Sequence, residues 1–101
     1  MALAQLEHVI RQGEGLVQVR AYVLKAEIYS EQGDYGSART SYLQGLEAAE
    51  MELRQKREAL KEQLTGEGLP LSQYTRMVRE IAQLEEQVEE IHAALELLPL
   101  P

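Results

Sequence analysis

The sequence contains no cysteine, no tryptophan and no phenylalanine, and only three of its 101 residues are proline. The absence of cysteine excludes disulfide bonds, thiolate metal ligands and cysteine nucleophiles. Because five tyrosines are the only aromatic residues, leucine, alanine, isoleucine and valine must supply most of the core. These side chains suit long helices better than a sheet, so we expect an all-α protein.

Charge and hydropathy exclude two further classes of partner. Ten lysine and arginine residues against 17 aspartate and glutamate residues give a net charge of -7, and so acidic a chain is repelled by phosphate backbones. The longest apolar run, residues 93–100, is interrupted by Glu96 and Pro99 and falls far short of the ~20 apolar residues of a membrane span. The first residues also lack the basic segment and apolar core of a signal peptide. We therefore expect a cytoplasmic protein with no nucleic-acid or membrane partner.

The most informative stretch, residues 22–46, predicts two helices joined by a tight turn. Tyr22, Ala26 and Tyr29 recur at spacings of four and three, so they share one face of a helix. A second series on one face follows the turn: Ala38, Tyr42, Gly45 and Leu46. Between the two, Gly33 predicts a helix end because glycine adopts positive φ readily, and Asp34 is placed to cap the next helix.

This pattern resembles the tetratricopeptide repeat (TPR). The matching positions are Tyr22, Ala26, Tyr29, Gly33-Asp34-Tyr35, Ala38, Tyr42 and Gly45-Leu46. The match covers about 34 residues, roughly a third of the chain. Two features depart from the family: Lys25 is polar where the family prefers an apolar residue, and the second helix runs far beyond the repeat. The resemblance implies partner binding through inner helices, and an ordinary helical hairpin with the same turn is the alternative interpretation.

Periodicity also predicts the helices around this hairpin. A one-sided apolar stripe predicts a short helix over residues 2–12, which must dock on a neighbour because about eleven residues are marginal alone in water. Residues 16–32 are apolar over a broad face, so we expect this helix to be covered on both flanks. From residue 35 to about 65, leucines spaced by seven predict a coiled-coil helix about 45 Å long.

The fourth helix, predicted over residues 73–98, has the most regular pattern. Its apolar residues alternate spacings of three and four: Tyr74, Met77, Ile81, Leu84, Val88, Ile91, Leu95 and Leu98. A loop over residues 66–71, with Gly66 as the preceding C-cap and Ser72 as the following N-cap, predicts an antiparallel hairpin. The expected register places Leu60 near Met77, Leu53 near Leu84, Leu46 near Ile91, and Lys56 and Arg57 near Glu80.

We therefore expect one helical domain over residues 1–101: a TPR-like helix-turn-helix (2–50) continuing into a long antiparallel coiled-coil hairpin (51–98), then a tail (99–101). No pattern predicts catalysis, so we expect no enzyme. Glu89-x-x-His92 is only half of a di-metal motif that needs two copies, so we expect no metal or cofactor. A small helical bundle that binds a metal or a small ligand is the alternative function.

The leading prediction is a protein–protein interaction module: an adaptor, a scaffold or an oligomerisation domain. Most of the tyrosines suit the core, but Tyr22, Tyr29 and Tyr42 become natural partner anchors wherever they line a groove. The fourth helix suggests a homodimer through its seam, with the residues Ile81, Leu84, Val88 and Ile91 at the interface. The expected partner is thus another protein or a second copy of the chain.

Overall fold

The computed structural model describes residues 2–66, 68 and 70–99, which form four antiparallel α-helices and no β-strand. The helices are α1 (Ala2–Gln12), α2 (Gly15–Glu31), α3 (Tyr35–Thr65) and α4 (Leu71–Leu97). The predicted all-α fold is confirmed, and each helix boundary lies within two residues of its predicted position. Residues 67 and 69 of the predicted loop, and 100 and 101 of the predicted tail, lie outside the described residues.

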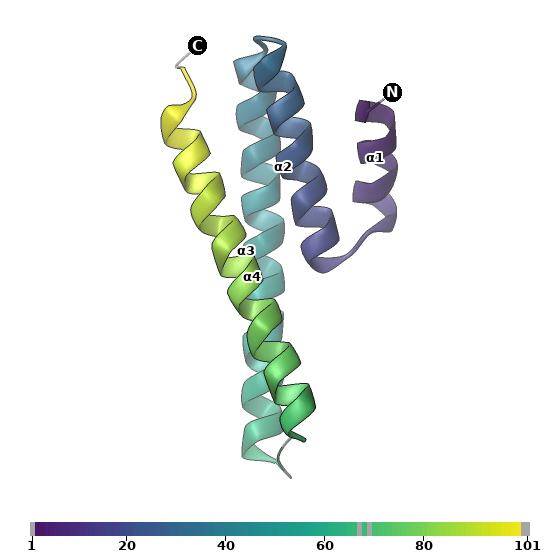
Figure 1. The fold of residues 1–101 in the computed structure, drawn as a ribbon, viewed down its shortest axis with the longest axis vertical. Coiled ribbons are helices and arrows are strands. Elements are labelled where there is room, and N and C mark those ends of the chain that lie inside the picture. Colours follow the sequence, from purple (N-terminus) through teal and green to yellow (C-terminus); the bar gives the residue numbers. More distant parts are fainter. Residues whose placement is uncertain (1, 67, 69, 100–101) are drawn as a thin grey trace.

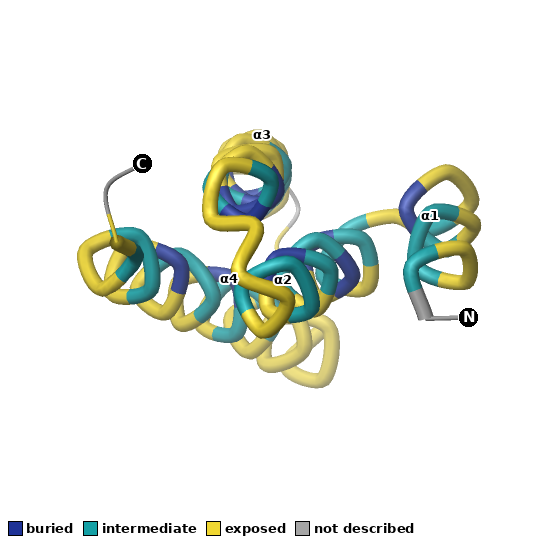
Figure 2. Tube along the Cα trace, turned by 90° about the horizontal axis from the view of Figure 1, so that it is seen from above, coloured by how far each residue is buried: buried dark blue, intermediate teal, exposed yellow. Residues whose placement is uncertain are grey.

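Three of the helices lie in one row, and the remaining helix lies over that row. Seen from above, α1, α2 and α4 lie in a row, and α3 lies over α2 and α4 (Figure 2). Helix α1 packs against α2 alone, whereas α2, α3 and α4 all contact one another. The hairpin of α3 and α4 extends well past the end of α2 (Figure 1), which gives the molecule an elongated shape of 52 × 27 × 16 Å.

Small residues allow the three central helices to approach closely. Ala26, Ala38 and Ala49 are fully buried. A Cβ atom on Gly45 would lie 3.0 Å from the Tyr22 Cβ and 3.5 Å from the Ile91 Cδ1, so this glycine of α3 sits where α2 and α4 meet. The absence of larger side chains at these positions therefore permits the close packing of α2, α3 and α4.

The core itself follows the predicted antiparallel register. Its buried members are Val19, Ala26, Tyr42, Ala49, Leu53, Leu84 and Ile91. Leu53 and Leu84 belong to this single cluster, and Leu46 packs against it. Gly45, the residue before Leu46, lies close to Ile91, as the register predicts. The ion pair between Lys56 and Glu80 fixes the same alignment.

The turn between α2 and α3 forms as the sequence predicts. Gly33 has a φ of +81°, a conformation that a Cβ atom disfavours. The Asp34 Oδ1 accepts a hydrogen bond from the Ser37 backbone N–H at 3.2 Å, which satisfies one free donor at the start of α3.

Of the two predicted caps of the α3–α4 loop, Gly66 is confirmed and Ser72 needs correction. Ser72 is not the N-cap of α4, because the helix begins at Leu71 and the Pro70 carbonyl already accepts the backbone N–H groups of Gln73 and Tyr74. Gly66 is the C-cap of α3, but its φ is -90°. Gly68, among the described residues of this loop, has a positive φ of +89°.

Candidate functional site

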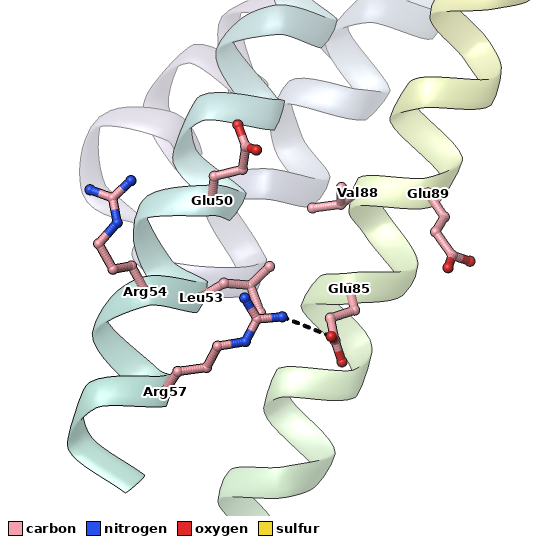
Figure 3. A pocket seen from close by; sticks show the side chains of 7 residues that line it. All are labelled: Glu50, Leu53, Arg54, Arg57, Glu85, Val88 and Glu89. Atoms are coloured by element: carbon pink, nitrogen blue, oxygen red, sulfur yellow. Dashed lines mark hydrogen bonds and ion pairs between the residues drawn. The ribbon is translucent and has the colours of Figure 1, made fainter. Parts of the chain in front are cut away.

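Because α3 lies alone over the row of the other helices, a groove runs along each of its flanks. The first, which we call the tyrosine groove, lies between α2 and α3, and its lining includes Gln18, Tyr22, Lys25, Tyr29, Thr40, Gln44, Glu47, Ala48 and Met51. The second, the hairpin groove, lies between α3 and α4 and is lined by Glu50, Leu53, Arg54, Arg57, Glu85, Val88 and Glu89 (Figure 3).

The floor of the tyrosine groove comes from one face of α2. Gln18, Tyr22, Lys25 and Tyr29 are spaced by four, three and four residues, so they project from the same side of the helix. Together with α3 they border two adjoining hollows of about 350 and 280 Å³, which share Gln44. Met51 stands on the α3 wall with 51% of its surface exposed. The groove thus consists of two neighbouring hollows that are apolar in part and open to solvent.

Helix α1 is held against α2 by two polar contacts along this groove. The Gln18 side-chain amide donates to the Ile10 carbonyl at 2.8 Å. Lys25, the polar residue in the otherwise apolar series, forms an ion pair with Glu7 of α1. The hydrogen bond from Lys25 holds the pKa of Glu7 below its ordinary value, against a smaller opposing effect of burial. Lys25 therefore attaches α1 instead of presenting a free charge to a ligand.

Of the three tyrosines predicted as partner anchors, two line this groove. Tyr22 and Tyr29 are half-buried and border its two hollows. Tyr42 is only 6% exposed and belongs to the core. Burial raises its pKa above the ordinary tyrosine value, with a smaller contribution from Glu27. The expectation that most tyrosines are core residues is wrong, since Tyr42 alone of the five is buried and Tyr35 and Tyr74 are exposed.

The hairpin groove has an apolar floor between charged rims. Leu53 and Val88 point toward each other across it, and Arg57 reaches over to Glu85 with a hydrogen bond of 2.8 Å (Figure 3). The cavity measures about 420 Å³. Arg54 and Glu89 are directed outward from the two walls (Figure 3), and neither forms an ion pair within the described residues.

The opposite side of the α3–α4 hairpin is closed by charge pairs. The Lys56 ammonium donates to Glu80 at 2.7 Å and lies 3.5 Å from Glu52 on its own helix. The hydrogen bond to Glu80 raises the pKa of Lys56 above the ordinary lysine value, opposed in part by burial. These residues border the start of α2, so the hairpin is covered on this side and open on the hairpin-groove side.

The residues predicted for a dimer seam on α4 mostly face the interior of this chain. Leu84 and Ile91 are fully buried, and Ile81 and Val88 pack against the same core. A second copy therefore meets Leu84 and Ile91 only if α4 leaves α3. The heptad pattern identified correctly which face of α4 is apolar, but the same pattern describes pairing within one chain and pairing between chains.

The described residues contain no group of three or more histidine, aspartate or glutamate side chains placed to hold a metal ion. His92 is exposed on α4. Across the same part of the chain, no helix is both long and apolar enough to cross a membrane.

No protein-family model, no curated protein and no solved structure matches this chain. Its function is therefore inferred from the two grooves.

Proposed function

We propose that the protein is a protein–protein interaction module, an adaptor or scaffold, that binds a helical segment of another protein in the tyrosine groove. The supporting observation is the open flank of α3 above α2, where Tyr22 and Tyr29 are only half-buried and border two neighbouring hollows. Grooves between two packed helices commonly accept a third amphipathic helix, which buries its apolar face there.

The chemistry of the groove suits such a ligand. Tyrosine offers a rigid apolar ring and a hydroxyl group at little entropic cost, and Met51 adapts its shape to a partner side chain. Gln18 and Gln44 add amide groups that can donate and accept hydrogen bonds. Because the charge of Lys25 is balanced by Glu7, the floor has no free cation that selects for an acidic ligand.

The resemblance of residues 22–46 to a TPR favours the same function, and we assign the pair of helices α2 and α3 to a repeat of this type as part of the proposal. A single repeat buries too little surface to be stable, and three or more usually stack. Here α1 and α4 cover the two flanks of α2, where neighbouring repeats would otherwise lie. We propose no catalytic activity for this arrangement.

The test is capture of partners from cell extract with the wild type and with groove variants. Met51→Glu places a charge on the exposed wall without entering the core, and Tyr22→Ala with Tyr29→Ala removes the aromatic floor. We expect proteins captured by the wild type to be lost with both variants and retained with Tyr35→Ala, the matched control, because Tyr35 is exposed and lies outside the groove. Thermal unfolding confirms that each variant is folded. An identical set of captured proteins for all variants would refute the proposal.

A further inference from the structure

A second regular series runs along the solvent side of α3, beside the hairpin groove. We call it the outer stripe: Leu43, Glu47, Glu50, Arg54, Arg57, Lys61 and Leu64, spaced alternately by four and three residues. All seven residues are exposed, and both leucines leave about half of their surface in solvent, 49% for Leu43 and 53% for Leu64. The spacing is that of a coiled-coil seam. Within the described residues, Arg57 is the one member of the stripe that forms an ion pair, with Glu85 of α4.

The charges of the stripe are complementary to those of a second copy that runs in the opposite direction. Residues at equal distances on either side of Arg54 form matching pairs, to within one residue. These pairs are Leu64 with Leu43, Lys61 with Glu47, and Arg57 with Glu50. If two copies of α3 lie antiparallel with Arg54 at the centre, leucine therefore meets leucine at both ends. Each acidic side chain in between meets a basic one. Such a contact uses the same surface on both partners, as a two-fold symmetric interface requires.

The α4 wall of the hairpin groove carries the same gradient of charge. Leu71, Val78 and Glu85 are spaced by seven residues and Glu89 follows one turn later, so this wall is apolar near the loop and acidic toward the C-terminus. Leu71 and Val78 are exposed, 78% and 41% respectively. The open side of the hairpin is thus basic and apolar at its loop end and acidic at the other end.

We propose that a second copy of this chain docks antiparallel on the outer stripe, with a two-fold axis near Arg54, and forms a homodimer. A second copy is the partner that the observations specify, because the order of charges matches this sequence read backward. Glu47, Glu50 and Lys61 form no ion pair within the described residues, so their charges are available to the second copy. Arg57 already pairs with Glu85 of its own chain, so in the dimer its guanidinium is shared between Glu85 and Glu50 of the second copy. Arg54 lies near its own copy, which is unfavourable, and Glu50 one turn away in each chain offsets it.

This surface is separate from the one used in the proposed partner binding. Glu47 alone borders both the outer stripe and the tyrosine groove. Lys61 lies far along the hairpin and does not line the tyrosine groove, so a variant there tests dimer formation without altering the groove. Unchanged capture of partners by a Lys61 variant that has lost the dimer would separate the two proposals.

The first experiment measures molar mass by light scattering and sedimentation over a range of protein and salt concentrations. We expect the wild type to reach twice the monomer mass of 11.4 kDa and to dissociate as salt increases. Lys61→Glu should raise the dissociation constant by about tenfold, because two pairs per dimer become repulsive. Adding Glu47→Lys to this variant should restore the dissociation constant of the wild type. Arg76→Glu, the same kind of charge change on an exposed residue of α4 outside the stripe, is the matched control and should have no effect.

The second experiment tests orientation, using the absence of native cysteine. Arg54→Cys should give a disulfide-linked dimer on mild oxidation, since two residues on the axis lie close together. Lys61→Cys should not, because its two copies are separated by about 14 residues of helix, roughly 21 Å, far beyond disulfide reach. A monomer at every concentration, no rescue by the charge exchange, or equal crosslinking at both positions would overturn the proposal.

Discussion

Replacing Gly45 with alanine has two opposing effects on stability: alanine is the better helix former, but its methyl group crowds a neighbouring atom. Alanine in the interior of a helix is favoured over glycine by about 1 kcal/mol. The new methyl group would lie 3.0 Å from the Tyr22 Cβ, which is closer than carbon atoms normally approach. Because that Cβ is attached directly to the backbone, it cannot rotate away, so α2 and α3 must move apart. Overpacking of this kind costs typically about 1–3 kcal/mol.

We therefore expect Gly45→Ala to destabilise the fold by about 1 kcal/mol net, which lowers the melting temperature by about 4–8 °C for a domain of this size. The Ile91 Cδ1 contributes little to this loss, since a contact of 3.5 Å is ordinary. Thermal unfolding followed by circular dichroism at a fixed protein concentration measures the effect, and the fixed concentration removes any contribution from association.

Gly36→Ala is the matched control for the propensity effect alone. This glycine lies in the first turn of α3. The atom nearest to a Cβ placed on it would be the Asp34 Oδ1, at 4.0 Å. We expect Gly36→Ala to be neutral or to stabilise by up to about 1 kcal/mol. If Gly45→Ala raised the melting temperature as much as Gly36→Ala, then α2 and α3 would not be in close contact at Gly45, and the packing described above would be wrong.

Three further predictions concern the core and the ion pairs. Leu84→Ala should cost about 2–5 kcal/mol in urea unfolding, since the side chain is fully buried, and a loss below about 1 kcal/mol would contradict its position. The pKa of Glu7 is lowered in the folded state, so the stabilisation by Lys25 is complete above the ordinary glutamate pKa of about 4.3 and is lost as pH falls through the lower folded value. Glu7→Gln should remove that part of the acid dependence, and an unchanged pH profile would contradict it. The pKa of Lys56 is raised, so its contribution is complete below about pH 10.4 and is lost as pH rises through the folded value. Lys56→Met should reduce this loss of stability at alkaline pH, which is measured by unfolding between roughly pH 9 and 12. A variant with the same alkaline profile as the wild type would argue against the ion pair between Lys56 and Glu80.

Periodicity and turn chemistry predicted the elements of the fold because both act locally. Gly33 and Asp34 mark the α2–α3 turn by their own conformational and capping preferences, which the rest of the chain does not alter. The register of α3 and α4 was also predictable, because a short loop and two apolar stripes leave one antiparallel alignment that buries Leu53 against Leu84. Ser72 failed as a cap because Pro70 allows the helix to start earlier.

The candidate grooves were less predictable, because they depend on which helices lie beside each other. The sequence identified Tyr22 and Tyr29 as possible anchors, but only the placement of α1 and α3 shows that they border a groove while Tyr42 lies in the core. Lys25 looked like a defect in an apolar series, and its partner Glu7 lies on a separate helix 18 positions earlier in the chain. Pairing between elements of this kind leaves no periodic signal.

The composition of the core explains why so much apolar surface remains outside it. Three of the fully buried positions of α2 and α3 are alanines, Ala26, Ala38 and Ala49, which bring the helices together but bury little area. The bulkier Leu43 and Leu64 remain on the surface of α3. Single exposed leucines are common in soluble proteins, but these two terminate a stripe whose charges are arranged in mirror order around Arg54. Solubility alone requires only that the charges be present, whereas their mirrored order follows directly if the stripe pairs with an antiparallel copy of itself.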